Sequence, residues 1–116
     1  MAEENCLFCK IIAGQFPASF VHQDEHCVVI RDINPQAPMH VLVIPREHIE
    51  SLDEVSQREE MLMGHLLRVG ARVANDEGHA ENSYRSVINT GAGAGQSVFH
   101  LHVHLLGGRT LHWPPG

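Results

Sequence analysis

The sequence has 116 residues, of which 43% are hydrophobic and 19% are charged, and its formal net charge at pH 7 is −6. These values predict one globular domain, residues 1–116, with a modest core. The acidic balance, without a run of lysines and arginines, argues against nucleic acid or an acidic membrane as the main partner. Because the sequence has no signal-peptide pattern and no apolar stretch of about 20 residues, we expect a cytoplasmic protein that does not span a membrane.

Short apolar runs separated by turn-forming residues predict the first half of the fold. Residues 6–13 have the pattern of one or two helical turns that stop at Gly14. Three short runs that follow predict strands: 19–24, 27–33 and 40–45. A turn with two prolines, residues 34–38, separates the last two runs, because proline fixes φ and removes a backbone donor.

The middle of the chain has the pattern of a long helix. Ser56 precedes Glu59 by three residues, which is the spacing of a capping box, and Gly78 is a plausible stop. Apolar residues then recur on one helical face: Leu62, Leu66, Val69 and Val73. Two further strands are predicted at 84–89 and 98–106. Short connections between neighbouring strands favour an α+β fold, with a five-stranded antiparallel sheet, a long central helix and a short N-terminal helix.

Histidine is the unusual residue of this sequence, which contains ten of them. In the segment HLHVHLL, residues 100–106, successive side chains of a strand would alternate, so His100, His102 and His104 would share one face. Imidazolium groups at this spacing repel one another, so some of the three must stay neutral near pH 7. The pattern alone leaves three interpretations, namely a metal site, a nucleophile with its supporting groups, or a solvated strand face.

A glycine-rich loop precedes the histidines. Gly91, Gly93 and Gly95 fall within residues 89–97, where missing side chains would leave backbone N–H groups open to an anion. The loop is not a P-loop, since no Gly-Lys-Ser/Thr follows and the next predicted element is a strand. Such a loop can also be merely flexible, but its place beside the histidines favours a phosphate site.

Cys6 and Cys9 form a C-x-x-C pair, which in a cytosolic chain indicates either a redox pair or half of a zinc site. A thioredoxin-type pair would require a βαβ unit, and that pattern is absent from the sequence. The odd number of cysteines fits a disulfide framework poorly. Cys27, within an apolar run, is expected in the core.

These motifs together resemble the histidine-triad (HIT) nucleotide-binding family. HLHVHLL matches the family's His-x-His-x-His signature, and the resemblance extends over most of the chain: residues 8–18, 31–45, 95–109 and 112–116. The segment DINPQAP and the ending HWPPG resemble the Hint branch of nucleoside phosphoramidate hydrolases. The resemblance implies a HIT-like fold, a homodimer, and cleavage of the P–N bond of purine nucleoside 5′-phosphoramidates such as adenosine 5′-monophosphoramidate.

The resemblance also implies a covalent mechanism. His102 would attack the α-phosphorus to form a nucleotidyl-histidine, which water then hydrolyses; neutral imidazole suits this role as a nucleophile. His104 and His40 would contact the phosphoryl group or its leaving atom. The Ser97 hydroxyl would help to protonate the departing amine.

Substrate-binding residues follow from the same resemblance. Asp32 would bind the ribose hydroxyls, although an aspartate before a turn can also simply cap it. Trp113 of one protomer would shape the specificity pocket of the other. The residues expected at the phosphate are Asn89, Gly95, Gln96 and Ser97, together with His102 and His104. Those expected around the purine, which periodicity alone would place in the core, are Leu7, Phe8, Ile11, Ile30, Ile33 and Leu42.

Some bacterial members of the family, which this chain resembles, complete the C-x-x-C pair with two histidines. The resemblance thus implies a structural Zn²⁺ site, not required by the chemistry, with four ligands: Cys6, Cys9, His48 and His100. Two other functions stay open at this point. One is a zinc-dependent hydrolase whose metal is held jointly by His100, His102 and His104. The other is a nucleotide-binding regulatory protein with vestigial hydrolysis. The sequence leaves open the amine and the choice between adenine and guanine.

Overall fold

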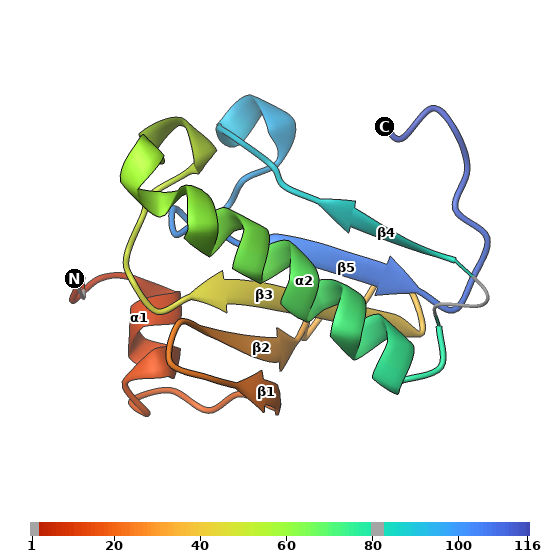
Figure 1. The fold of residues 1–116 in the computed structure, drawn as a ribbon, viewed down its shortest axis with the longest axis horizontal. Coiled ribbons are helices and arrows are strands. Elements are labelled where there is room, and N and C mark those ends of the chain that lie inside the picture. Colours follow the sequence, from red (N-terminus) through yellow and green to blue (C-terminus); the bar gives the residue numbers. More distant parts are fainter. Residues whose placement is uncertain (1–2, 80–82) are drawn as a thin grey trace.

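The computed structural model describes residues 3–79 and 83–116 and is shown in Figure 1. Its helices and strands are α1 (Leu7–Ile12), β1 (Phe20–Gln23), β2 (Cys27–Arg31), β3 (Met39–Pro45), α2 (Glu60–Asp76), β4 (Tyr84–Val87) and β5 (Val103–Gly107). Short 3-10 turns cover Leu52–Glu54, Gln57–Glu59 and Ala92–Ala94. Among the described residues, no helix is both long and apolar enough to cross a membrane.

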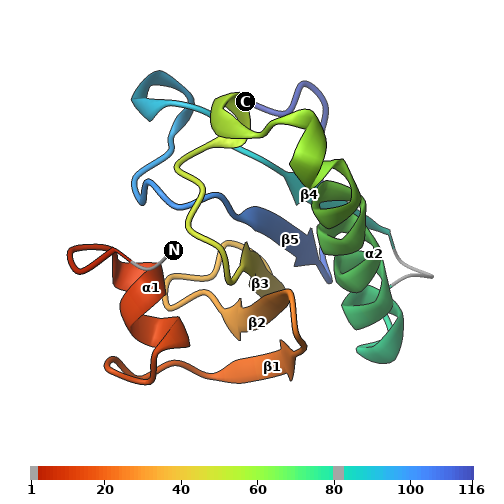
Figure 2. The ribbon, with the colours of Figure 1, turned by 60° about the vertical axis from the view of Figure 1, so that its left-hand side comes forward.

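The five strands form one antiparallel sheet in the order β1-β2-β3-β5-β4. The two helices cover opposite faces of the sheet (Figure 2). Side chains alternate along β2 and β3, so Val29 and Val43 face α2, whereas Val28 and Leu42 face α1. The α+β fold predicted from the sequence is therefore confirmed.

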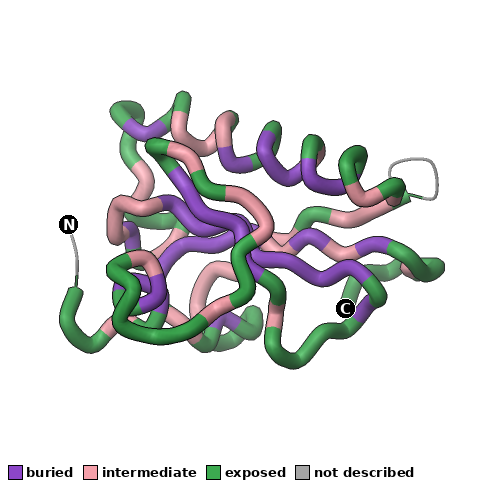
Figure 3. The backbone as a smooth tube through the Cα atoms, turned by 90° about the horizontal axis from the view of Figure 1, so that it is seen from below, coloured by how far each residue is buried: buried purple, intermediate pink, exposed green. Residues whose placement is uncertain are grey.

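The long helix begins and ends as predicted. The backbone N–H of Ser56 donates to Glu59 Oε1 at 2.8 Å and forms the capping box, and one 3-10 turn leads into α2. Leu66, Val69 and Val73 of α2 are buried against the sheet, as Figure 3 shows along one side of this helix. Gly78 follows the helix with a φ of +81°, a conformation that glycine adopts without strain.

The strand predicted at residues 98–106 is shorter than expected, because β5 begins only at Val103. The ladder between β3 and β5 ends at the pair Val43 and Val103, and Pro45 offers no backbone N–H beyond it. Instead the Pro45 carbonyl accepts a hydrogen bond from His100 Nε2, and the Leu101 N–H donates to the Ile49 carbonyl. The predicted alternation survives outside the strand, since Leu101 packs in the α2 core while His100 packs against α1.

Candidate active site and metal cluster

A cavity of about 340 Å³ lies on the α1 side of the sheet. Its apolar lining residues are Leu7, Phe8, Ile11, Phe16, Pro17, Ala18, Ile30, Ile33 and Leu42. Its polar lining comes from Asp32, Asn89, Gly95, Ser97, His102 and His104, and Arg31 and Val98 complete the walls. A cavity that combines many apolar side chains with a few hydrogen-bonding groups suits a ligand that carries a flat base and an anionic group.

The His102 ring has a defined tautomer. Its Nδ1 lies 2.7 Å from the His100 carbonyl oxygen, and because a carbonyl only accepts, Nδ1 carries the proton and donates. The lone pair is therefore on Nε2. Burial lowers the pKa of His102, so the ring is neutral near pH 7. Phe8 of α1 packs edge-on against the ring with centroids 5.0 Å apart and fixes its plane. Together these contacts give a neutral, oriented imidazole with a free Nε2 lone pair.

His40 and His104 form a second chain of hydrogen bonds. The Gln36 N–H donates to His40 Nδ1 at 3.0 Å, so the proton of neutral His40 is on Nε2, 3.0 Å from His104 Nδ1. His104 Nδ1 accepts this bond and its Nε2 carries the proton. Burial, then the neighbouring imidazoles of His102 and His40, lower the pKa of His104 to about 4. The pair thus presents an uncharged N–H donor from His104, while His40 lies behind it rather than on the cavity wall.

Asp32 caps a turn and also lines the cavity. Its Oδ1 accepts the Asn34 N–H at 2.8 Å and caps the turn after β2. Its Oδ2 lies 3.4 Å from His40 Nε2, and the residue also lines the cavity. A carboxylate held in this way could accept hydrogen bonds from the hydroxyl groups of a ligand.

The glycine-rich loop supplies part of the polar lining of the cavity, but not through all of its predicted residues. Gly95, with a φ of +95°, lines the cavity beside Asn89 and Ser97, although its own N–H donates to the Ala92 carbonyl. Gln96 is buried outside the cavity. Its Oε1 accepts the Gly91 N–H at 2.9 Å and its Nε2 donates to the Glu50 carbonyl at 2.7 Å. Gln96 therefore shapes the loop from behind.

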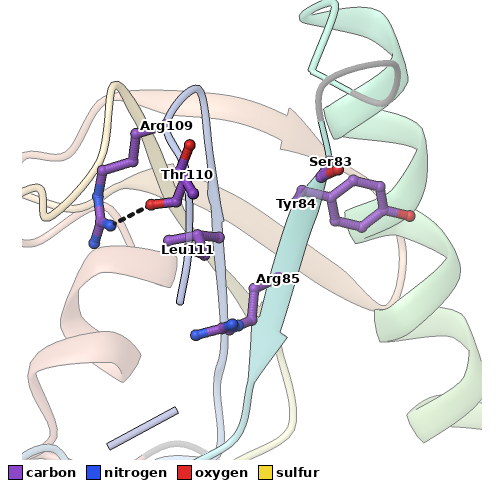
Figure 4. Close-up of a pocket in the computed structure, with 6 residues that line it drawn as sticks. All are labelled: Ser83, Tyr84, Arg85, Arg109, Thr110 and Leu111. Atoms are coloured by element: carbon purple, nitrogen blue, oxygen red, sulfur yellow. Dashed lines mark hydrogen bonds between the residues drawn. The ribbon is translucent and has the colours of Figure 1, made fainter. Parts of the chain in front are cut away.

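Trp113 also lies outside the cavity, and its side chain is 82% exposed. A separate hollow of about 250 Å³ lies beneath this C-terminal segment, and Figure 4 shows Arg85 extending from β4 toward it. Arg85 Nη2 donates to the His112 carbonyl and Arg109 Nη1 donates to the Thr110 carbonyl. The two guanidinium groups thus hold the backbone of the segment that presents Trp113 to solvent.

Several cavity residues were not predicted from the sequence: Phe16, Pro17, Ala18, Arg31 and Val98. The first three belong to the connection between α1 and β1, where periodicity gives no indication of which way a side chain points. Phe16 is half exposed at the rim. An aromatic residue directly before a proline in a connecting segment was the available signal, because a large exposed apolar side chain often marks a binding surface.

A cluster of four predicted ligands lies next to the cavity. Each of four residues places one ligand atom within 4.8 Å of the ligand atoms of the other three: Cys6, Cys9, His48 and His100. His100 Nδ1 lies 3.3 Å from Cys6 Sγ, 3.5 Å from Cys9 Sγ and 3.2 Å from His48 Nδ1. A tetrahedral zinc site with such ligands has edges of roughly 3.3–3.8 Å, so the spacing fits.

The protonation of His100 fits the same use. Its Nε2 lies 2.8 Å from the Pro45 carbonyl and must donate, which leaves the Nδ1 lone pair facing the two thiols. The ring is fully buried, and this burial lowers its pKa to about 4. The four residues could therefore hold a metal ion.

Comparisons with known proteins identify the family of the chain. The profile of the HIT domain family matches residues 13–111. The chain belongs to the HIT family. The purine nucleoside phosphoramidase of Escherichia coli K12 is 46% identical over 111 residues, which are 96% of this chain and 92% of that protein. An uncharacterized HIT-like protein of Synechococcus elongatus is 50% identical over 97% of this chain and 98% of its own length.

Solved structures show the same fold. A HIT family hydrolase from Legionella pneumophila superposes with a TM-score of 0.95 and 46% identity, covering 97% of this chain and all of that one. A HIT family hydrolase from Clostridium thermocellum superposes with a TM-score of 0.93 and 45% identity, covering 96% of both chains. This chain is thus similar to hydrolases of the family over nearly its whole length.

Proposed function

We propose that this HIT protein hydrolyses purine nucleoside 5′-phosphoramidates, such as adenosine 5′-monophosphoramidate, through a covalent nucleotidyl-His102 intermediate. The observation that carries this proposal is the hydrogen bond from His102 Nδ1 to the His100 carbonyl. This bond leaves the nucleophilic lone pair on Nε2 of a cavity-lining ring. The 46% identity to a purine nucleoside phosphoramidase supports the choice of substrate class.

In the first step, His102 Nε2 forms a bond to the α-phosphorus as the P–N bond breaks. The ring becomes an imidazolium whose Nδ1–H still donates to the His100 carbonyl, which stabilises the new positive charge. The His104 N–H and the Asn89 amide would hold the phosphoryl oxygens as charge shifts between them. The departing nitrogen takes the electron pair of the broken P–N bond, and the Ser97 hydroxyl relays to it a proton from solvent.

In the second step, water attacks the phosphorus of the intermediate and the P–Nε2 bond breaks. The electron pair returns to Nε2, so His102 is neutral again, and the proton from the water passes to solvent. The products are a nucleoside 5′-monophosphate and an amine. His40 contributes by keeping its Nε2–H on His104 Nδ1, which fixes the His104 donor toward the cavity.

The substrate's nucleoside would occupy the rest of the cavity. The purine would lie among the apolar side chains, where its burial contributes most of the binding energy. The ribose hydroxyls would donate to Asp32, whose carboxylate is already oriented by the Asn34 N–H. AMP and GMP would bind in the same way as products.

Cys6, Cys9, His48 and His100 would hold a structural Zn²⁺ in the cell, and the spacing of their ligand atoms supports this. Bound zinc supplies no step of the hydrolysis and ties α1 to the segment that carries His100. We also include a cytoplasmic homodimer in the proposal, in which Trp113 reaches the partner's cavity. Its 82% exposure in a single chain is consistent with such a contact.

A shared catalytic metal on all three triad histidines receives less support from the geometry. Within residues 3–79 and 83–116, His100 groups with Cys6 and Cys9, and His104 groups with Asp32 and His40. His102 belongs to neither of these potential ligand groups. Its Nδ1 proton is bound by a carbonyl, and its Nε2 faces the cavity.

Intact-mass measurement after brief exposure to adenosine 5′-monophosphoramidate tests the proposal. The wild-type protein should gain the mass of one nucleotidyl group, and His102→Ala should gain none. His26→Ala, which changes a half-exposed histidine far from the cavity, is the matched control and should label like wild type. An adduct that persists in His102→Ala would refute the assignment. Hydrolysis without any adduct, lost on mild chelation and restored by zinc, would favour a metal mechanism.

A further inference from the structure

A second cluster of histidines lies at the β1–β2 hairpin, on the opposite face of the sheet from the cavity. His22 Nε2 lies 2.8 Å from Asp24 Oδ2, and His65 Nε2 of α2 lies 2.9 Å from the same oxygen. Cys27 Sγ lies 3.6 Å from that oxygen. None of these residues takes part in the proposed hydrolysis, and they join two elements that are distant in sequence.

The Asp24 carboxylate is held in place before any ligand binds. Its Oδ1 accepts the backbone N–H groups of His26 at 2.7 Å and Cys27 at 2.8 Å. These two bonds leave Oδ2 directed at His22 and His65. Hydrogen bonds from both imidazoles and both amides lower the pKa of Asp24 in spite of its partial burial, so the carboxylate is ionised at neutral pH.

We propose that His22, Asp24 and His65 form a second metal site, for a divalent transition ion such as Zn²⁺. Two neutral imidazole nitrogens and one carboxylate oxygen are a common ligand set for such ions, with the remaining position taken by water. In the metal-free cluster, a proton on each Nε2 bridges to Oδ2. On binding, each imidazole moves that proton to Nδ1 through solvent and gives its Nε2 lone pair to the metal.

Both histidine contacts with Asp24 are close to the spacing of metal ligands. Nitrogen and oxygen ligands of tetrahedral zinc lie roughly 3.3 Å apart, so the contacts of 2.8 and 2.9 Å must lengthen by about 0.5 Å. His22 and Asp24 already group with Cys27, with one ligand atom each within 4.8 Å of the others, and His65 must turn toward this group when the ion binds. Solvent reaches the ligands, because the side chains of His22, Asp24 and His65 are 29%, 24% and 33% exposed. His65 also lines a hollow of about 520 Å³ through which an ion could enter.

Two neighbouring residues affect how tightly the second site would bind a metal compared with the cysteine cluster. Cys27, whose Sγ lies 3.6 Å from Asp24 Oδ2, groups with His22 and Asp24 as a potential ligand, so its thiol could replace the water ligand after losing its proton to solvent. Arg46 Nε donates to the main-chain carbonyl of Asp24 at 2.7 Å and places a positive charge nearby. The site should therefore bind metal more weakly than the two thiols and two imidazoles of the cysteine cluster.

Equilibrium dialysis of the full-length protein against Zn²⁺, at a free concentration of about 10 μM, tests this site by counting bound metal. We expect His22→Gln and His65→Gln each to hold one equivalent fewer than wild type. His26→Gln, whose ring centroid lies 5.3 Å from that of His65 without reaching Asp24 Oδ2, is the matched control and should hold as many as wild type. The readout is a difference between proteins, so it does not depend on how the cysteine cluster is filled or on hydrolysis.

Thermal unfolding gives a second readout. A metal that bridges the β1–β2 hairpin to α2 stabilises the folded state, so added Zn²⁺ should raise the Tm of wild type more than that of either variant. Circular dichroism confirms that both variants are folded. Equal metal counts in wild type and both folded variants, or an equal rise in Tm, would overturn the proposal.

Discussion

His100 and His102 are two residues apart, yet their rings have opposite tautomers. His100 donates from Nε2 to the Pro45 carbonyl and turns its Nδ1 lone pair toward two thiols. His102 donates from Nδ1 to the His100 carbonyl and leaves its Nε2 lone pair for the cavity. In each case a carbonyl, which only accepts, decides which nitrogen is free. The chemistry available to a histidine is thus set by the carbonyl it meets and not by its place in a repeated motif.

Removing the His102 ring should produce the largest effect. In His102→Ala no other imidazole offers a free lone pair to the same part of the cavity, so kcat for phosphoramidate hydrolysis should fall at least about 10³-fold. Steady-state kinetics with adenosine 5′-monophosphoramidate measures this loss. A decrease of less than tenfold would show that the free Nε2 is not the nucleophile.

Removing the His100 ring should affect stability more than chemistry. His100→Ala deletes a fully buried side chain and a potential metal ligand but keeps the carbonyl that orients His102. We expect the free energy of unfolding to fall by about 2–4 kcal/mol. Urea denaturation and metal analysis give these values. If the folded variant loses as much kcat as His102→Ala, the division of roles between the two rings is wrong.

The variant His40→Ala tests whether His40 orients the N–H donor of His104. His40→Ala removes the hydrogen bond to His104 Nδ1, which fixes the His104 tautomer. Losing such a bond should lower kcat about 10- to 100-fold. KM should change less, because His40 does not line the cavity. A change in KM alone would instead indicate that His40 serves substrate binding.

The lowered pKa of His104 predicts a pH dependence of stability. Burial brings this pKa to about 4 in the folded chain, whereas an unfolded histidine titrates near 6.5. Below about pH 6.5 the unfolded state binds a proton that the folded state does not, so stability falls as the pH falls toward about 4. Between pH 7 and pH 5, His104→Gln should lose about 2 kcal/mol less than wild type in urea denaturation. An identical slope for His104→Gln and wild type would contradict this account.

The smallest effect concerns the loop that faces His102. Gly95 has a φ of +95°, and an added Cβ would lie 3.7 Å from Asn89 Nδ2. Gly95→Ala should therefore cost about 1 kcal/mol of stability through backbone strain. Gly93→Ala is the matched control, because a Cβ there meets nothing within 4 Å, and it should change stability by less than about 0.5 kcal/mol. Equal effects would mean that the left-handed conformation of Gly95 is not needed.

Much of this architecture could be predicted from the sequence because local patterns specify it. The capping box of Ser56 and Glu59 and the apolar face of α2 mark one helix, and alternation separates Leu101 from His100. These features depend on residue types at fixed spacing, which a sequence displays directly. Most of the cavity-lining residues, by contrast, were expected only from the resemblance to the HIT family, because periodicity alone would place the apolar ones in the core.

Other features depend on contacts between distant residues and could not be predicted. The sequence does not reveal that Gln96 turns away from the cavity toward the Glu50 carbonyl, 46 residues away. It also does not reveal that Pro45 ends the ladder and so excludes residues 98–102 from β5. Likewise, the meeting of His22 and His65 at Asp24 requires the hairpin to pack on α2. In each case the local structure depends on a contact with a distant residue, and only the tertiary fold brings the two residues together.

The double use of His100 has a consequence for how such a protein can change over time. Its ring is one of four potential metal ligands, whereas its carbonyl orients the proposed nucleophile His102, and every amino acid carries that carbonyl. Substitutions at Cys6, Cys9, His48 or the His100 ring can therefore remove or restore a metal site without rebuilding the neighbouring active site. Because the main chain orients His102 and side chains form the potential metal site, the metal site can be lost or regained while the active site is kept.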